Sequence, residues 1–532
     1  MLFHTWTFLG FFVVVLVGYF GLQKTKLWLP WLFLSSYVFY GAWNPFYLIL
    51  VFYSTLLDYL IVACMDGCAI RRAPRGVPGW LGNGFASSRV AWCYRVAGMV
   101  TIGAFGLVVA GPETFRFVGG VTAVIVGLIA LAARYENRKV WLATSLVNNL
   151  SVLVFFKYAD FLIENLNGLF LSLRLSMQFP AAASLMPMGL DYLLPVGISF
   201  YTFQSMSYTI DFYRGQIPRE RSFVRFATFV SFFPQLVAGP IERAKNLLPQ
   251  FNSFPRVTRE DVTDGLSLFV VGLFKKLALA NYLSFYVERV YENPAQSSGM
   301  ALAFGTFAFA WQIFFDFSGY TDMARGVARL MGFRLMLNFN NPYLATSLAD
   351  FWSRWHISLS TWFRDYVYIP LGGNRNGVWR AHQNLAITFL VSGIWHGAAW
   401  TFVVWGGLHA VGTIVTRSLE RVPWYQDRVP RWVKQGLVFL FVCYAWIYFR
   451  AESIADANLI VTRILGMNWA DPGMPLLMVL LVFSVWGYQW VYESSWKRCL
   501  AFPVVKVTVV TMMLLWLCFF SSGGGEFIYF QF

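Results

Sequence analysis

The residue best placed to do chemistry is His396, which stands in the segment VSGIWHGAAW (391–400). An ionisable side chain in so apolar a segment is a functional-site hypothesis by default, because placing it inside a membrane is costly. Its neighbours are small, and small residues let another helix or a substrate come close to the backbone. They are Ser392, Gly393, Gly397, Ala398 and Ala399, bracketed by the large rings of Trp395 and Trp400. The alternative is a structural histidine bonded to a carbonyl of a neighbouring helix; we favour the functional interpretation.

A second histidine, His356, lies in the segment FWSRWHISLS (351–360). If the helix is continuous, helical spacing places Arg354 and Asp365 away from it. The residues on its own side are then Trp352, Ser353, Leu359, Ser360 and Phe363. His356 could line the floor of a cavity or act as an interfacial hydrogen-bonding group, and both interpretations stay open. The other histidines carry less weight: His4, His382 and His409, the last of which lies in the same apolar region as His396.

Two acids, Asp316 and Asp322, lie close to a membrane segment in the stretch WQIFFDFSGYTDMARG. Six residues apart, they do not share a face of a continuous helix, and Gly319 suggests a break between them. A proton relay is one interpretation. We favour ion-paired structural acids, because charges inside membranes usually pair.

One or two histidines in this setting are suited to general-base catalysis. A neutral imidazole can take the proton from a hydroxyl as that hydroxyl attacks a thioester. No cysteine or GxSxG-type serine adjoins His356 or His396 in the sequence, which disfavours a covalent acyl-enzyme.

The composition predicts the elements that must hold these residues. Of 532 residues, 58% are hydrophobic and 13% are charged, against about 25% charged in soluble domains. A soluble fold could not bury 53 Phe and 23 Trp without exposing aggregating patches. We therefore predict an all-α integral membrane protein with many spanning helices. The net charge of +15 sits in short clusters rather than in a basic stripe, so the sequence predicts no nucleic-acid partner.

Apolar runs of nearly spanning length predict roughly ten to thirteen crossings. The runs are 8–22, 27–41, 44–64, 96–111, 118–133, 140–156, 192–212, 223–238, 264–287, 300–316, 384–416, 433–449, 474–492 and 503–521. The first run is expected to be a retained helix rather than a signal peptide. The basic loops 71–95, 134–139 and 214–225 predict the cytoplasmic side and an external amino terminus.

Two segments do not fit the pattern of a helix that simply crosses the membrane. Residues 239–260 are basic again after one short run that Pro234, Gly239 and Pro240 interrupt, which predicts a re-entrant element. Residues 338–382 predict helices at the cytoplasmic interface, with a capping box at Ser347-x-x-Asp350. An aromatic stripe at helical spacing supports this placement: Trp352, Trp355, Leu359, Trp362 and Tyr366.

The six cysteines form neither a zinc pattern nor a disulfide framework. Cys64-x3-Cys68 has no second pair and no nearby histidine, so we expect no metal.

Four segments resemble the membrane-bound O-acyltransferases: PVGISFYTFQSMSYTIDFYRG, QLVAGPIERAKNLLPQF, FDFSGYTDMARG with the following NPY…FWSRWHISLSTWFRDYVYIPLGGNR, and WHGAAWTFVVWGGLHA. The resemblance is strongest between about residues 195 and 409, and it is closest to the bacterial branch that acetylates alginate. It implies a helical core around a funnel or tunnel, with His396 at the position of the family's catalytic histidine and His356 at its second polar position.

The resemblance also implies a reaction and a setting. Acetyl groups would pass from cytoplasmic acetyl-CoA across the bacterial inner membrane to periplasmic acetyltransferase partners, which modify an exopolysaccharide such as alginate or cellulose. The ending SSGGGEFIYFQF resembles the aromatic tail of the same branch, which would place the acyl group or hold a partner.

For the phosphate-rich donor we suggest the basic cytoplasmic residues Arg243, Lys245, Arg354, Arg364 and Arg375. Each could equally be an ordinary cytoplasmic-side charge, and basic loops also attract anionic lipid. A domain division follows: amino-terminal transmembrane helices (1–190), a catalytic core (191–420), and carboxy-terminal helices with the tail (421–532). The competing functions are a multi-span transporter, although no internal repeat is visible, and a non-catalytic scaffold of a polysaccharide-modifying complex.

Overall fold

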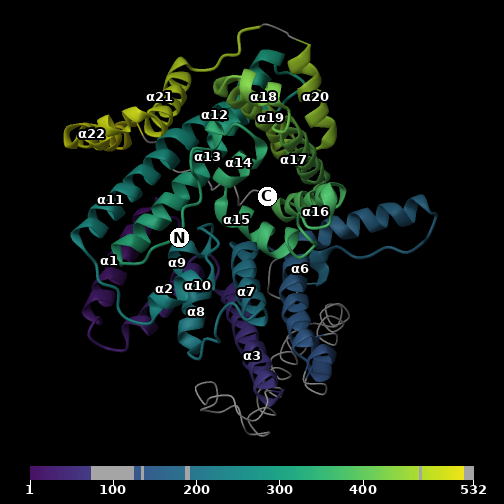
Figure 1. Ribbon diagram of the computed structural model, residues 1–532, viewed down its shortest axis with the longest axis vertical. Coiled ribbons are helices and arrows are strands. Elements are labelled where there is room, and N and C mark those ends of the chain that lie inside the picture. Colours follow the sequence, from purple (N-terminus) through teal and green to yellow (C-terminus); the bar gives the residue numbers. More distant parts are fainter. Residues whose placement is uncertain (73–124, 133–136, 186–191, 467–469, 521–532) are drawn as a thin grey trace. The chain divides into compact units, whose positions relative to one another are not determined.

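The computed structural model describes residues 1–72, 125–132, 137–185, 192–466 and 470–520, which form helices and connecting loops and, within those ranges, no strand (Figure 1). They cluster into two compact units. Unit 1 holds residues 9–237 and 241–255, and unit 2 holds residues 2–8, 238–240 and 256–532. The predicted basic loop 71–95, the run 96–111 and the tail lie wholly or mostly outside the described residues, and so does half of the run 118–133. The three-part domain division stays a prediction.

The helices of unit 1 are mostly long and apolar, with two short elements near the end. They are α1 (Trp6–Gly21), of which the first turn belongs to unit 2, α2 (Trp28–Gly41), α3 (Leu48–Arg72), α6 (Arg138–Ser172), α7 (Ile198–Tyr213), α8 (Phe223–Ser231), α9 (Phe233–Leu236) and α10 (Ala244–Leu247).

Unit 2 contains the longest buried helix and most of the aromatic core. Its helices are α11 (Arg259–Phe274), α12 (Asn281–Tyr291), α13 (Gly299–Leu330), α14 (Leu348–Arg354), α15 (Ile357–Phe363), α16 (Gly377–His396), α17 (Trp400–Leu419), α18 (Pro423–Arg428), α19 (Arg431–Arg450), α20 (Ile454–Leu465), α21 (Leu476–Glu493) and α22 (Pro503–Phe520).

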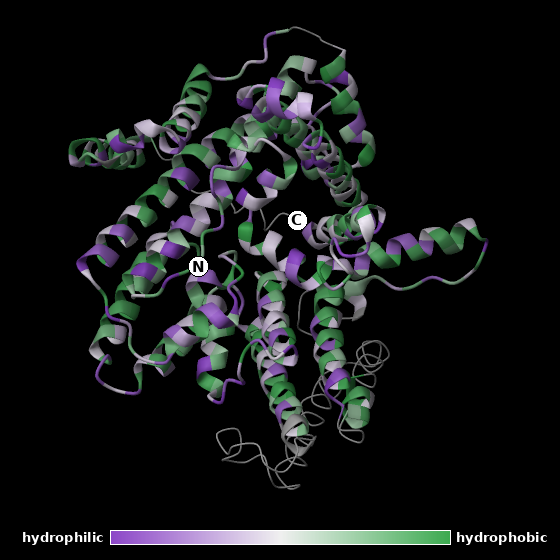
Figure 2. Cartoon of the chain, in the orientation of Figure 1, coloured by the Kyte–Doolittle hydropathy of each residue, from purple (hydrophilic) through white to green (hydrophobic). Residues whose placement is uncertain are grey.

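The all-α membrane class is confirmed. Seven helices of the described residues are long and apolar enough to cross a membrane: Pro45–Cys68, Arg138–Ser172, Arg259–Tyr291, Gly299–Leu330, Arg431–Arg450, Leu476–Glu493 and Pro503–Phe520. Many large apolar side chains lie on the outer surface, and Figure 2 shows apolar residues along the outer faces of the helices. The helix α22 buries none of its described side chains, as expected for a helix surrounded by lipid. The predicted tunnel stays a prediction.

The break predicted within the run 223–238 is confirmed, whereas its re-entry into the membrane stays a prediction. Where the sequence has a single run at 223–238, the structure has α8, of nine residues, and α9, of four. Neither is long enough to span a bilayer, and residues 226–244 are all buried. Irregular backbone at this depth is therefore surrounded by protein, which is the condition for tolerating it.

Unit 2 is built on a close approach between α11 and α13, which run side by side in Figure 1. A Cβ added to Gly272 would lie 2.5 Å from the carbonyl oxygen of Gly319, and one on Gly326 would lie 2.6 Å from that of Gly265. Only glycine allows such backbone contact. The break predicted at Gly319 is therefore wrong: α13 passes through it unbroken, and the glycine makes room for the neighbouring helix.

The two acids on α13 are ion-paired, as we favoured from the sequence. The Asp316 carboxylate lies 2.6 Å from the Lys276 ammonium, and both side chains are almost fully buried. Asp322 lies 2.7 Å from Lys275 and 3.5 Å from Arg325. Both lysines stand on a π-helical turn, Lys275–Ala280, that joins α11 to α12.

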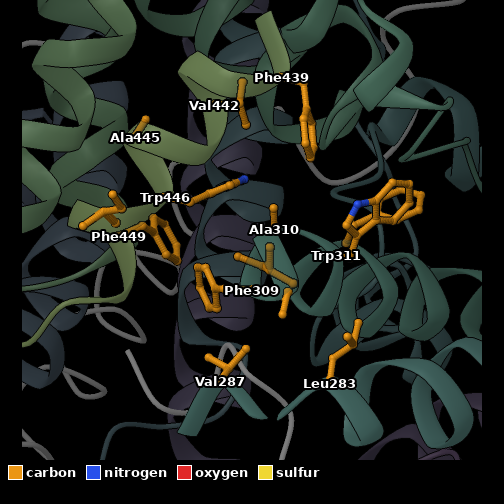
Figure 3. Packing of buried hydrophobic residues seen from close by; sticks show 14 of the residues in the cluster. Leu283, Val287, Phe309, Ala310, Trp311, Phe439, Val442, Ala445, Trp446 and Phe449 are labelled. Carbon is orange, nitrogen blue, oxygen red and sulfur yellow. The ribbon is translucent and has the colours of Figure 1, made fainter. Parts of the chain in front are cut away.

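An aromatic core fills the space between α13 and α19. Figure 3 shows Trp446 and Phe449 of α19 close to Phe309 of α13, with Trp311 on the same helix as Phe309. The rings of Phe309 and Trp446 lie 6.3 Å apart and nearly perpendicular, a favoured aromatic arrangement. This packing holds α19 against α13.

Unit 1 contains a buried acid, Asp58 of α3, that the sequence analysis did not single out. Its carboxylate accepts hydrogen bonds from the Ser145 hydroxyl at 2.6 Å and the Asn149 amide at 2.9 Å, both on α6. It also accepts one from the Ser205 hydroxyl on α7. One fully buried side chain therefore joins three helices through hydrogen bonds.

We expect Asp58→Ala to lower the melting temperature of the detergent-purified protein, because each buried donor left unsatisfied costs about 1–3 kcal/mol. Asp58→Asn keeps one acceptor oxygen and should lose less. The matched control is Asp66→Ala on the same helix, since Asp66 is half-exposed and pairs with Arg219 at 3.3 Å. Equal melting temperatures for Asp58→Ala and Asp66→Ala, measured by intrinsic fluorescence, would contradict this role.

Candidate functional site

His396 is the last residue of α16, and the chain turns there rather than continuing. Gly397 and Ala399 are extended (φ −166° and −147°), and α17 begins at Trp400. The run 384–416, taken from the sequence as a single apolar segment, is therefore two helices packed against each other (Figure 1). That part of the prediction is wrong, because hydropathy does not register a corner made of small apolar residues.

The corner depends on backbone contact between α16 and α17, which confirms the predicted small-residue seam. A Cβ on Gly393 would lie 2.3 Å from the carbonyl oxygen of Phe402. One on Gly406 would lie 2.5 Å from the carbonyl oxygen of Phe389. The two helices can be this close only because both positions lack a side chain.

Three aromatic rings surround the His396 imidazole, which is 4% exposed. Their centroids lie 5.0 Å (Trp395), 4.9 Å (Trp405) and 5.3 Å (Phe449) from that of the imidazole, all edge-to-face. They come from α16, α17 and α19. These three rings therefore fix the orientation of the imidazole. A functional group that must present one nitrogen in a defined direction needs such support.

His356 lies at a bend, which corrects the predicted continuous helix. The helix α14 ends at Arg354, α15 begins at Ile357, and His356 between them has a left-handed backbone (φ 43°). The predicted N-cap is confirmed at the start of α14, where the Asp350 N–H donates to the Ser347 hydroxyl at 3.2 Å. The reciprocal bond of the predicted capping box is shifted by one residue, since the Asp350 carboxylate accepts from the Thr346 N–H at 3.1 Å. A left-handed conformation is costly for a residue with a side chain, and such residues cluster at functional sites.

The aromatic stripe was predicted to lie at the lipid–water interface, and for three of its members that is wrong. Trp355, Leu359 and Trp362 are buried inside the protein. Because the bend at His356 redirects the chain, helical spacing counted through it does not describe one face.

The structure brings the two predicted histidines together around one indole. The Trp395 ring lies 5.0 Å from His396 and 6.4 Å from His356. Residues forty positions apart in sequence thus share an aromatic neighbour in unit 2. Their roles in catalysis stay predictions.

A third histidine, His409, belongs to the same aromatic group, although the sequence gave it less weight. The Trp352 indole N–H donates to its Nδ1 at 3.3 Å, and its ring lies 4.7 Å from that of Trp405. Trp405 thus separates His409 from His396, and the bond ties α17 to α14 close to the bend. Its place in the same apolar region as His396 was the sequence signal for it.

The predicted donor-binding cations fall in both units, and each has its own surroundings. Arg354 is held by Asp350 at 2.7 Å and Glu493 at 2.6 Å, and Arg364 lies 2.9 Å from Asp365. Arg375 is exposed on the loop before α16. Arg243, which is buried, and Lys245, which is exposed, belong to unit 1.

A basic pocket of about 410 Å³ lies between α11 and the end of α13, and sequence reasoning did not single it out. Its charged lining includes Arg325, Arg329 and Arg334 beside Asp264, over an apolar wall. Arg329 is already paired with Asp261 at 2.8 Å and with Asp264 at 3.2 Å.

Residues 140–455 match the model of the MBOAT, membrane-bound O-acyltransferase family. The chain belongs to this family. The match covers more than half of the chain and includes both histidines and the Trp395 indole between them. The resemblance seen in the sequence motifs is confirmed.

Relatives within the family act on polysaccharides, by their names. The chain is 42% identical to the probable alginate O-acetylase AlgI of Azotobacter vinelandii, over 61% of this chain and 62% of the relative. It is 40% identical to the protein of the same name from Pseudomonas aeruginosa, over 66% and 64%. It is 31% identical to the peptidoglycan O-acetyltransferase of Helicobacter pylori, over 74% and 83%. The chain thus spans somewhat less than two thirds of the alginate O-acetylases it matches.

The close contact between α16 and α17 predicts how valine substitutions at two glycines change the stability of the protein. Gly406→Val should lower the melting temperature, because overpacking a close contact costs about 1–3 kcal/mol. The neighbouring Gly407 has nothing within 4 Å of an added Cβ, so Gly407→Val is the matched control on the same helix. Thermal unfolding of both variants in detergent is the measurement, and equal losses would refute the close approach as the reason for glycine at 406.

Proposed function

We propose that this protein is a membrane O-acyltransferase that takes acetyl groups from cytoplasmic acetyl-CoA and supplies them for O-acetylation of an exopolysaccharide. The observation that carries the proposal is the pairing of His396 and His356 around Trp395, within the region that matches the family. Relatives named for alginate and for peptidoglycan support a polysaccharide as the final acceptor.

In the proposed reaction His396 acts as general base. It takes the proton from the acceptor hydroxyl as the oxygen attacks the thioester carbonyl carbon. The C–O bond forms, the C–S bond breaks, and the proton passes from the imidazole to the departing thiolate. Coenzyme A and an ester are the products, so no oxidant and no metal is needed. The fixed rings of Trp395, Trp405 and Phe449 would keep the imidazole oriented and exclude bulk water.

The cellular setting completes the proposal. A multi-pass protein with basic loops facing the cytoplasm would sit in the bacterial inner membrane and receive the donor from that side. Because polysaccharide is modified outside, we propose that periplasmic acetyltransferases receive the acetyl group.

The proposal predicts that His396→Ala lowers acetyl transfer by about 10²–10⁴-fold, the usual contribution of a general base. The assay follows label from [¹⁴C]acetyl-CoA into an acetyl ester, in proteoliposomes that contain the protein and its exported acceptor system. His382→Ala, one histidine earlier on α16, is the control and should keep wild-type rates.

Each other outcome identifies a competing function. Label that stays in acetyl-CoA while an intact solute crosses the membrane would favour a transporter. Full transfer by His396→Ala would rule out the base and leave a scaffold role.

The arginines predicted to bind the acetyl-CoA donor differ in their surroundings: Arg364 and Arg375 are exposed, whereas Arg354 is held by two acids. Arg364→Glu and Arg375→Glu should raise the apparent KM for acetyl-CoA several-fold and leave the melting temperature unchanged, because a carboxylate repels phosphate at an exposed site. Arg354→Gln should instead lower the melting temperature, since it removes the ion pairs of Arg354 with Asp350 and Glu493. Initial rates against acetyl-CoA concentration, with thermal unfolding on the same samples, measure both; unchanged KM values would remove Arg364 and Arg375 from the donor site.

A further inference from the structure

The segment that precedes α14 holds both the backbone and the ring of His356. The Asn340 N–H donates to the Arg354 carbonyl at 2.9 Å, and the Ile357 N–H donates to the Asn338 carbonyl at 2.9 Å. These bonds lie on either side of His356 and fix the bend. The Asn338 side chain, which is 1% exposed, then faces the imidazole.

The hydrogen bonds of Asn338 identify which atom of its amide faces His356. The backbone N–H of Ser358 donates to Oδ1 at 3.1 Å, and a backbone N–H can only donate. The atom at this position must therefore be the amide oxygen, because the NH₂ group would oppose a second donor. The Ser358 hydroxyl donates to the same oxygen at 2.9 Å, which commits its only proton.

The Nδ1 atom of His356 thus faces two acceptors. It lies 3.2 Å from Asn338 Oδ1 and 3.4 Å from the Ser358 hydroxyl oxygen. Neither can donate a proton to it, so a hydrogen bond forms only if Nδ1 carries the proton. In a neutral imidazole the lone pair is then on Nε2.

The surroundings keep the ring neutral. The rings packed around it include Phe317 at 4.6 Å from α13, Phe339 at 6.3 Å and Trp395 at 6.4 Å from α16, none of which is charged. The nearest charged group along the chain, Arg354, is engaged by Asp350 and Glu493. Burial lowers the pKa of His356 to about 3.

We propose that Asn338 is a positioning residue that holds His356 as the Nδ1–H tautomer, so that His356 serves the reaction through Nε2 as a hydrogen-bond acceptor. In this arrangement His356 accepts from the hydroxyl that is to be acylated and orients it for His396, and it does not donate to the developing oxyanion. The role in acylation rests on the proposed function; the tautomer itself does not.

The test reads the tautomer directly. The protein has five histidines, so ¹⁵N-histidine labelling gives a small set of ring signals, and His356→Gln assigns those of His356. At neutral pH the wild type should show a protonated Nδ1 and an unprotonated Nε2. Asn338→Leu removes the acceptor and should abolish this preference. Asn340→Leu, an exposed asparagine two residues away, is the control and should leave the spectrum unchanged.

Two results would overturn the proposal: a wild-type His356 protonated on Nε2, or an unchanged tautomer in Asn338→Leu. If Asn338→Leu does not fold, the isosteric Asn338→Asp gives the answer. A carboxylate facing Nδ1–H raises the pKa of His356, so the doubly protonated ring should persist to higher pH than in the wild type. An unchanged ¹⁵N titration would overturn the proposal equally.

Activity separates this inference from the proposed function. Asn338→Leu should lower kcat about 10–100-fold with KM for acetyl-CoA unchanged, as for other outer-shell partners of functional histidines. Asn338→Asp should recover most of that rate at alkaline pH, where the ring is again singly protonated on Nδ1. Wild-type protein with the expected tautomer but no acetyl transfer would refute the proposed function alone, and a wild-type kcat in Asn338→Leu would refute the role of Asn338 in acylation.

Discussion

The approach of the α16 and α17 backbones at Gly393 and Gly406 is the constraint on which the site depends. Because the two helices nearly touch there, the three residues 397–399 can reverse the chain within a single corner. His396, at the end of α16, then meets Trp405 of α17 and Phe449 of α19 as ring neighbours. A bulkier pair of residues would separate the helices, and the imidazole would lose the neighbours that fix its direction.

Several buried polar groups of the described residues are organised in local sets. Asp58 accepts hydrogen bonds from two other helices, Asp316 pairs with Lys276, and Asn338 Oδ1 accepts from the N–H and the hydroxyl of Ser358. Each set lies where several helices join. In a membrane, where apolar burial gives helices little reason to prefer one another, such sets specify which helices pair.

The sequence predicted the membrane class, the family, the N-cap at Ser347 and the seam around His396, because each leaves a local signature in residue type or spacing. It did not predict the corner after His396 or the bend at His356. Both are changes of backbone conformation confined to one to three residues inside apolar or aromatic stretches, and hydropathy and helical periodicity continue through them unchanged. The Asn338 contact, the Trp352–His409 bond and the Asp58 cluster were missed for another reason: each joins residues far apart in the chain, with no fixed spacing to reveal them.

The left-handed backbone at His356 affects the stability of any variant at this position, whatever the imidazole does in the reaction. Alanine removes the imidazole but keeps the conformational penalty of a Cβ, which the Nδ1–Asn338 bond no longer offsets. Glycine removes the imidazole and the penalty together, and asparagine tolerates the same angles while keeping a polar group. The difference in stability between alanine and glycine at this one position therefore reports the strain at the bend, once the greater unfolded-state entropy of glycine is subtracted, and it does not depend on any chemistry that the ring performs.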